Sequence, residues 1–338
     1  MITMRHEVRD TERRAPIVPE DAARLVASGI RLTVEESPQR IFPSSAYADA
    51  GCAIAPAGSW VDAPEDEYVV GLKELPDHPP ALRHRHVFFG HAYKGQLGGP
   101  ALLRRFVAGG GTLLDLEYLV DDAGRRLAAF GYWAGYTGAA LAILHHRGRL
   151  TTPLRPVSKA ALDDLLRADA GAARALVTGA LGRSGRGACD ALETAGIEPT
   201  RWDIEETRAL DRAALLDHDI LVNAVLVTEP TTPFLTPQAL LAPHRLAVVA
   251  DVTCDVTSDC NVLPIYDRTT TWAQPVRRQA GAVDVIAIDN LPSLLPAEAS
   301  TSFSAELAPH LMSLVDDGPA WRRCRRAFQE ACEKELSP

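Results

Sequence analysis

The fold class is decided by one glycine-rich stretch, Val177-Thr178-Gly179-Ala180-Leu181-Gly182-Arg183-Ser184-Gly185-Arg186-Gly187. An apolar strand-like run precedes it and a helical pattern comes after it. Its glycines allow a tight turn and a close approach of the backbone to a bound anion, and the helix N-terminus supplies oriented N–H groups. The spacing is G-x-x-G-x-x-G instead of the usual G-x-G-x-x-G, so the pattern alone would also fit a structural glycine turn.

The residues downstream of this stretch favour a dinucleotide site. Asp203 lies 24 residues after Gly179, at the end of a predicted strand over 200–202. An acid at this place binds ribose hydroxyls and repels the 2′-phosphate of NADP, so it favours NAD. Nearby Arg183, Arg186 and Arg201 leave NADP open as the alternative. Apolar runs over 220–225 and 246–252 fit later strands of a nucleotide-binding sheet.

The first 120 residues alternate short helical patterns with short apolar runs, which is typical of parallel strands joined by crossovers. A helix is predicted over 20–28, because Pro19 and two acids open it and Gly29 closes it. The predicted strands cover residues 31–35, 68–72, 87–89 and 112–114.

Polar residues come directly after three of these predicted strands. They are Lys73-Glu74 after the first, His91 after the second, and Asp115 with Glu117 after the third. Ligands of open parallel sheets bind outside the carboxyl ends of the strands, so catalytic groups are expected here. Each residue alone would also fit a simpler role: a surface lysine, a hydrogen-bonded structural histidine, or a chain leaving a sheet into water.

The second half of the chain predicts a second domain. The Gly- and aromatic-rich segment 130–136 is interpreted as a domain crossing that leads into a helix ending near His146. A helix over 160–168 and a strand over 175–177 come next. Helices are predicted over 305–315 and 321–334, and the second is expected to return to the first domain. The order of these elements predicts an α/β protein of two domains with parallel sheets. The predicted domains are residues 1–132 plus about 318–338, and residues 133–317.

Composition limits the class of protein. The chain has 338 residues, is 46% hydrophobic and 23% charged, and carries a formal charge of −9. These values indicate a compact globular protein that binds neither nucleic acid nor anionic membranes. Because the first ten residues are charged and no apolar run approaches ~18 residues, we expect a cytoplasmic protein. Six cysteines without a Cys-x-x-Cys pair are read as reduced thiols. No metal is expected, although His84-x-His86 has ligand-like spacing.

Taken together, these residues resemble NAD-dependent, L-lysine-forming saccharopine dehydrogenase, a family related to the alanine dehydrogenases. The resemblance runs through ordered blocks that include Glu12-Arg13-Arg14-Ala15-Pro16, Gly71-Leu72-Lys73-Glu74, His91-Ala92-Tyr93-Lys94-Gly95-Gln96, Gly124-Arg125-Arg126, Trp202-Asp203-Ile204-Glu205-Glu206-Thr207 and Ile288-Asp289-Asn290-Leu291-Pro292. It implies two Rossmann-like domains with the active site in the cleft between them. It also implies an oxidoreductase of lysine biosynthesis that oxidises the secondary amine of saccharopine with NAD. The resulting imine is cleaved by water to L-lysine and 2-oxoglutarate. The expected partners are small amino acids and 2-oxo acids, and the expected state is a monomer or small homo-oligomer.

The resemblance also implies roles for individual residues. Lys73 and His91 would be the acid-base pair. Beside them, Glu74 and Glu117 are expected to act as supporting residues that offset the positive charge of Lys73 and Lys94. Around the substrate it places Arg14, Lys94, Gln96, Arg125, Arg126 and Phe130. Around NAD it places Gly179, Gly182, Arg183, Ser184, Gly185, Asp203, Thr207, Val252, Asp289, Asn290 and Leu291.

These roles agree with the chemistry of the side chains. A histidine with an ordinary pKa near 6.5 can move protons in both directions, whereas a lysine near 10.4 needs burial or a neighbouring cation to act as a base. Arginine forks suit a tricarboxylic substrate. The alternatives are an opine-type dehydrogenase that joins a different amine to a 2-oxo acid, an alanine-dehydrogenase-like deaminase, and a catalytically silent NAD-binding protein.

Overall fold

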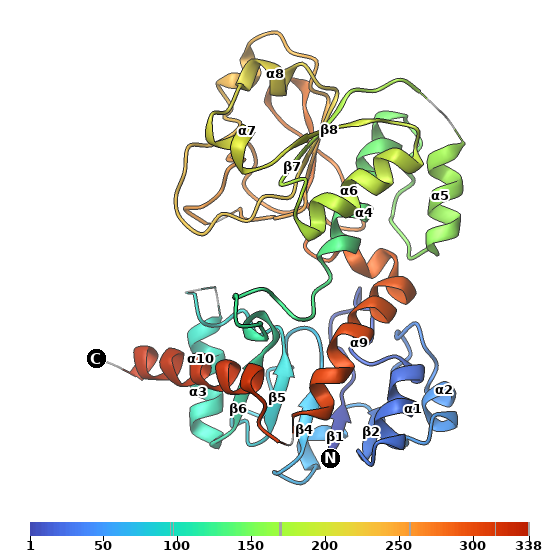
Figure 1. Cartoon of the computed structure of the whole chain (residues 1–338), viewed down its shortest axis with the longest axis vertical. Helices are drawn as coiled ribbons and strands as arrows, with labels where there is room; N and C mark the ends of the chain where they lie inside the picture. The colour runs from blue at the N-terminus through green and yellow to red at the C-terminus, as the bar shows by residue number, and fades with distance from the viewer. Residues whose placement is uncertain (95, 97, 169–170, 257, 315, 337–338) are drawn as a thin grey trace. The chain divides into compact units, whose positions relative to one another are not determined.

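The computed structural model describes residues 1–338 except 95, 97, 169–170, 257, 315 and 337–338, and it forms two compact units (Figure 1). Unit 1 consists of Met1–Ala129 and Ala299–Pro338, and unit 2 consists of Phe130–Glu298. The chain therefore changes unit near residues 129 and 299, whereas the sequence prediction placed the changes near 132 and 317. Gly95, which belongs to one of the resemblance blocks, and the predicted helix end at 315 lie outside the described residues.

Unit 1 is built on a parallel sheet of six strands in the order β3-β2-β1-β4-β5-β6. Its strands are β1 (Ile2–Met4), β2 (Leu32–Glu35), β3 (Ala53–Ala55), β4 (Tyr68–Val70), β5 (Arg85–Phe88) and β6 (Thr112–Asp115). The strand order reverses between β1 and β4, and a doubly wound sheet binds its ligand at such a switch point. Four of these strands were predicted. Strands β1 and β3 were missed, because Ile2–Met4 and Ala53–Ala55 lack the run of aromatic and β-branched residues that marks β4.

The helices of unit 1 are α1 (Pro19–Ala27), α2 (Ser44–Asp49), α3 (Gly99–Gly109), most of α9 (Pro296–Met312) and α10 (Pro319–Leu336), with two 3₁₀ turns, η1 (Ser59–Asp62) and η2 (Leu116–Tyr118). The α1 helix confirms the predicted helix to within one residue. In Figure 1, α10 lies beside α3, and Phe328 of α10 packs into the same apolar cluster as Leu103, Phe106 and Leu113. The C-terminal helix thus completes the core of unit 1.

Helix α9 begins at Pro296, nine residues before its predicted start at 305. Its first turns contain buried serines, so they do not show the apolar pattern from which a helix is predicted. The Oγ of Ser300 accepts a hydrogen bond from the backbone N–H of Ala15, and that of Ser304 accepts one from Val18. The predicted start was therefore wrong because this end of the helix packs through polar contacts.

Unit 2 is built on a second sheet of six strands, in the order β11-β12-β10-β9-β7-β8. Only β11 runs antiparallel to its neighbour among these pairs. The strands are β7 (Ala175–Thr178), β8 (Pro199–Trp202), β9 (Ile220–Asn223), β10 (Val248–Asp251), β11 (Arg277–Arg278) and β12 (Asp284–Ile286). Strand order reverses between β7 and β9, which places the crevice of this sheet beside the glycine-rich loop. Strands β7 to β10 confirm the prediction, and β11 and β12 were missed.

The helices of unit 2 are α4 (Gly131–His146), α5 (Lys159–Arg167), α6 (Arg183–Thr194), α7 (Ile204–Arg208) and α8 (Arg212–Leu216), with 3₁₀ turns η3 (Ala239–Leu241), η4 (Ala280–Ala282) and η5 (Leu291–Leu294). The predicted crossing segment is helical from Gly131 onward. Glycines on α4 and α6 allow the two helices to pack closely. A Cβ on Gly135 of α4 would lie 1.7 Å from the carbonyl oxygen of Ser184, and a Cβ on Gly187 of α6 would lie 2.0 Å from the carbonyl oxygen of Tyr132. Helices α4 and α6 therefore meet backbone to backbone, which holds the start of α6 in place.

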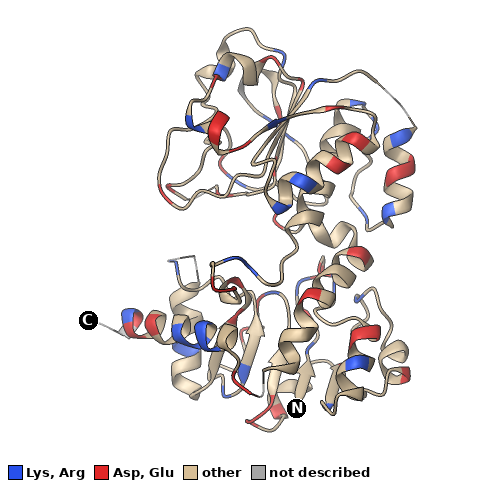
Figure 2. Cartoon of the chain, in the orientation of Figure 1, with Lys and Arg blue, Asp and Glu red and all other residues tan. Residues whose placement is uncertain are grey.

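Basic and acidic side chains are interspersed within each unit (Figure 2). Within the described part of the chain, none of the helices combines the length and the apolar character needed to cross a membrane.

Candidate functional site

Lys73 lies just beyond the end of β4, at the switch point of the unit 1 sheet, and is partly buried. The charge of Lys73 acts on two nearby carboxylates, those of Glu12 and Glu74. Burial opposes the ionisation of Glu12, but Arg14 and, more weakly, Lys73 hold the pKa of Glu12 below its ordinary value. Glu74 is similar: burial is outweighed by the hydrogen bond from Arg9, with a smaller contribution from Lys73, so the pKa of Glu74 is also lowered. Lys73 therefore lies near two carboxylates that are each paired with an arginine, Glu12 with Arg14 and Glu74 with Arg9.

Arg14 is buried and engaged by Glu12. Its Nε donates to Glu12 Oε1 at 2.8 Å, and its Nη2 lies 2.6 Å from Glu12 Oε2. The two side chains are 4% and 0% exposed. One edge of the Arg14 guanidinium, which was expected to bind the substrate, thus binds a protein carboxylate. Glu12 was not among the predicted site residues.

His91, Lys94 and Arg126 converge on Glu117. The distance from Glu117 Oε1 is 3.5 Å to His91 Nδ1 and 3.1 Å to Arg126 Nη2, and Lys94 Nζ lies 3.7 Å from Oε2. Burial opposes ionisation of Glu117, but the His91 hydrogen bond and these cationic groups lower its pKa to about 2. Glu117 is therefore ionised at neutral pH and joins side chains from two strand ends.

Asp115 holds the same two strand ends through the backbone. Its carboxylate accepts hydrogen bonds from the N–H of Gly90 at 3.2 Å and from that of Glu117 at 2.9 Å. Burial, reinforced by the charge of Glu117, raises the pKa of Asp115 to about 6. His91 comes after Gly90 with a φ of 48°, a conformation that residues other than glycine seldom adopt. The backbone at His91 is thus set by its surroundings.

Other predicted site residues have contacts of their own. Arg125 is 81% exposed and pairs with Asp121, and Glu74 is exposed and pairs with Arg9. The side chain of Gln96 accepts a hydrogen bond from the backbone N–H of Lys94 at 2.8 Å. Phe130 is the first residue of unit 2.

The glycine-rich loop of unit 2 has the shape that a pyrophosphate site needs. Gly179 adopts a φ of +72°, and a Cβ there would lie 2.8 Å from the carbonyl oxygen of Ala224. A Cβ on Gly185 would lie 2.1 Å from the carbonyl oxygen of Gly179. Gly182 precedes the first turn of the 12-residue helix α6, which begins with Arg183 and Ser184. The loop thus needs its glycines and leads directly to the N-terminus of α6, the end of a helix that favours an anion.

Asp203 comes directly after β8 and faces this loop. Its Oδ2 accepts a hydrogen bond from the N–H of Leu181 at 2.8 Å, and its backbone oxygen accepts one from the hydroxyl of Thr207. Leu181, Ile204 and Leu226 expose 70%, 63% and 71% of their surface. A carboxylate with neighbouring exposed apolar side chains can bind a ribose next to an aromatic base.

The remaining predicted NAD residues lie after other strands of the same sheet. Val252 comes directly after β10, and Asp289, Asn290 and Leu291 come after β12. Beneath them a buried chain of side chains links three strands: Thr178 donates to Asn223, Asn223 donates to Asp251, and Tyr266 donates to Asp251 at 2.7 Å. The carboxyl ends of β7, β9 and β10 are therefore held together by side chains as well as by the sheet.

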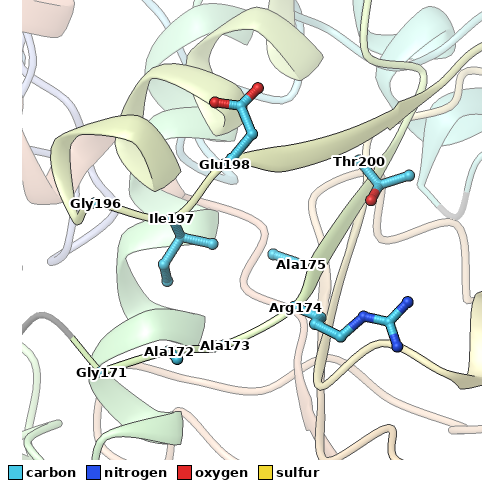
Figure 3. Close-up of a pocket in the computed structure, with 9 residues that line it drawn as sticks. All are labelled: Gly171, Ala172, Ala173, Arg174, Ala175, Gly196, Ile197, Glu198 and Thr200. Atoms are coloured by element: carbon cyan, nitrogen blue, oxygen red, sulfur yellow. The ribbon is translucent and has the colours of Figure 1, made fainter.

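A cavity of about 460 Å³ in unit 2 lies elsewhere (Figure 3). It is lined by residues 171–175, which precede or begin β7, and by Gly196, Ile197, Glu198 and Thr200, which precede or begin β8. Its place at the amino ends of the strands separates it from the glycine-rich loop.

Comparison with known proteins identifies both halves of the chain. The family model described as Alanine dehydrogenase/PNT, N-terminal domain, matches residues 3–137, and that described as Alanine dehydrogenase/PNT, C-terminal domain, matches residues 153–332. Among solved structures, an L-alanine dehydrogenase superposes with a TM-score of 0.70 over 98% of this chain and 94% of that one. At 15% identity this likeness shows a shared fold.

Curated relatives are much closer in sequence. The chain is 41% identical to a Neurospora crassa protein named saccharopine dehydrogenase (NAD(+), L-lysine-forming), over 98% of this chain and 96% of that protein. It is 39% identical to the Schizosaccharomyces pombe protein of the same name, over 98% of each.

Proposed function

The chain belongs to the saccharopine dehydrogenase family, and from this premise we propose that it interconverts saccharopine with L-lysine and 2-oxoglutarate, using NAD. In this proposal unit 1 is the catalytic unit and unit 2 is the NAD-binding unit. One observation carries it beyond the family name. The carboxyl edge of the unit 1 sheet brings two proton-carrying side chains, Lys73 and His91, beside ionised carboxylates.

The unit 2 residues fit NAD. Gly179 and Gly185 let the loop pack closely against its own backbone, at the carbonyl oxygens of Ala224 and Gly179, so the loop turns directly into the first turn of α6, where a pyrophosphate would bind. Asp203 would hold the adenosine ribose, while Val252 and residues 289–291 border the crevice. When bound, NAD accepts the hydride from the carbon next to the secondary amine of the substrate.

The unit 1 residues would manage the protons of this reaction. The substrate amine must lose a proton before oxidation, and the imine then needs water added and the nitrogen protonated as the C–N bond breaks. A histidine whose Nδ1 faces the carboxylate of Glu117 keeps Nε2 for such exchange. We propose that His91 serves the water-addition steps and that Lys73 receives the proton from the amine.

Substrate carboxylates require cations, and the cluster offers them. Arg126 and Lys94 both face Glu117, so a bound carboxylate would share these cations with it. Arg14, which Glu12 holds in place, is a further candidate for a substrate carboxylate. Replacing Arg126 with Ala should therefore raise KM for saccharopine more than it lowers kcat.

The test is NADH oxidation by the purified protein with 2-oxoglutarate and a panel of amines. Rapid turnover with lysine alone would support the proposal. Turnover with another amine or another 2-oxo acid would support the same type of reaction with a different, opine-type pair of substrates. Tight NADH binding without turnover on any pair would refute the enzyme assignment.

A further inference from the structure

Two charged side chains are buried beneath the segment that carries Lys73. They are Arg5 and Glu7, which leave the end of β1 at the switch point of the sheet. Their side chains are 1% and 5% exposed, and Arg5 Nη1 lies 3.3 Å from Glu7 Oε2. Neither residue has a role in the proposed reaction.

Together they hold both backbone polar groups of Lys73. Glu7 Oε2 accepts a hydrogen bond from the N–H of Lys73 at 3.0 Å, and its Oε1 accepts one from the N–H of Leu72 at 2.7 Å. Arg5 Nη2 donates to the carbonyl oxygen of Lys73. A residue has one backbone donor and one backbone acceptor. Arg5 and Glu7 bind both of these groups of Lys73, so the two residues form a clamp that leaves the Lys73 main chain little freedom.

Gly71 makes room for this arrangement. A Cβ at this position would lie 2.4 Å from Arg5 Nε and 2.8 Å from Arg5 Nη2. The guanidinium also lies over the ring of Phe88, with 5.6 Å to its centroid. The glycine of the Gly71-Leu72-Lys73-Glu74 block is thus needed so that Arg5 can reach the carbonyl of Lys73.

Stability alone explains this pair poorly. A buried ion pair often contributes no more than apolar residues of similar volume, because both charges lose their hydration. Here Arg5 Nε is buried without a hydrogen-bond partner among the described residues. An arrangement that costs desolvation yet fixes one backbone segment points to conformational control of that segment.

We infer that Arg5 and Glu7 are positioning residues, which fix the Lys73 backbone so that its amine is presented in one place. This inference deepens the proposed function, because it rests on the role of Lys73 as the proton acceptor. It predicts that loosening the clamp impairs the reaction step served by Lys73 while NADH binding in unit 2 stays intact.

The variant Glu7→Gln tests this most directly. An amide has one oxygen, so at least one of the two N–H groups loses its acceptor and faces a donor instead. A matched control is Glu67→Gln, since Glu67 is also buried in unit 1 and accepts a hydrogen bond from Thr3 at 2.8 Å, away from Lys73. Arg5→Lys is a second test variant, which keeps the charge but loses the fork that reaches two partners.

The first measurement is kinetic. We expect Glu7→Gln and Arg5→Lys to lower kcat by about tenfold or more, with the Kd for NADH unchanged, and Glu67→Gln to leave kcat within about twofold. Equal losses in all three variants would overturn the inference, since they would reflect general destabilisation of unit 1.

The second measurement does not depend on turnover. The chain contains only four lysines, Lys73, Lys94, Lys159 and Lys334, so reductive ¹³C-methylation gives few NMR signals, and Lys73→Arg identifies that of Lys73. We expect Glu7→Gln to shift or broaden the Lys73 signal alone, and Glu67→Gln to leave it in place. An unmoved Lys73 signal in both clamp variants refutes the clamp. An inactive wild-type protein refutes the proposed function instead, while the NMR result still decides the clamp.

Discussion

The two units use the same kind of sheet edge in different ways. In unit 1 the strands β1, β4, β5 and β6 end in charged side chains that contact one another, such as Arg5 with Glu7 and His91 with Glu117. In unit 2, Gly179 follows β7, and the ends of β7, β9 and β10 are joined by a buried hydrogen-bonded chain of Thr178, Asn223 and Asp251. In the proposed function, one edge holds the groups that exchange protons and the other holds backbone that the cofactor approaches. The proposal thus assigns chemistry and cofactor binding to the same architecture through different residues at the strand ends.

The largest effect should come from removing the amine of unit 1. Lys73→Met keeps the length of the side chain but cannot carry a proton. We expect kcat to fall by about 10²- to 10⁴-fold, the usual contribution of a general acid or base. The Kd for NADH, measured by fluorescence, should stay unchanged because its predicted site lies in unit 2. A parallel loss of NADH binding would contradict the division of labour between the units.

Gly179→Val is the matching change in unit 2. Its side chain would meet the carbonyl of Ala224 and must adopt a positive φ, which a β-branched residue strongly disfavours. We expect NADH affinity to fall by about tenfold or more, with the Lys73 NMR signal unmoved. Unchanged affinity would show that the dinucleotide does not use this loop.

Glu117→Gln tests the charge cluster through its pH dependence. The pKa of Glu117 is lowered to about 2, so its ionised form stabilises the fold above the ordinary value of 4.5, and this contribution is lost as the pH falls from 4.5 toward 2. Wild type should exceed the variant in stability near pH 7, and urea unfolding should show the gap closing near pH 3. Asp115 acts in the opposite sense, since its raised pKa removes stability as the pH rises through about 6. A gap that widens in acid would contradict this assignment.

A smaller effect is expected at His86, which is fully buried among Trp60, Phe88 and Phe106. Both ring nitrogens lack partners among the described residues, and burial lowers the pKa of His86 well below 6.5. His86→Phe should therefore raise the stability of unit 1 by about 1 kcal/mol. The gain should grow as the pH falls below 6.5, because wild type must then keep this ring neutral in the fold while it is protonated when unfolded. Thermal unfolding at two pH values checks both the sign and the trend.

Much of the architecture could be predicted from the sequence because its signals are local. Most central strands are continuous apolar runs, and the glycine-rich loop marks the turn into α6. Strand β1 is the informative failure: three residues at the start of a charged segment give no pattern, and its place in the middle of the sheet comes from pairing with β2 and β4. Helix α9 began earlier than predicted because Ser300 and Ser304 bury hydroxyls that bond to unit 1 backbone.

The types of side chain in the candidate site could be predicted from the sequence, but which of these side chains contact one another could not. Lys73, His91 and Glu117 stand out as polar residues at strand ends. The partnership of Glu12 with Arg14, and of Arg5 with Glu7, depends on how the segment after β1 folds back, which no spacing rule gives. One signal was available: of 35 basic residues only four are lysines, and two of these, Lys73 and Lys94, lie in the candidate site. In so arginine-rich a chain, a lysine is itself unusual.

The chain order of unit 1 has a consequence for biosynthesis. Unit 2 is one continuous segment, whereas unit 1 is interrupted after Ala129 and resumes at Ala299. On the ribosome, unit 2 can fold as soon as it emerges, while the sheet of unit 1 must wait for α10 to bring Phe328 onto Phe106 and Leu113. During translation of the intervening residues, this apolar face has no cover from its own chain. The nascent protein should therefore depend on chaperones most while the unit made first is still unfinished.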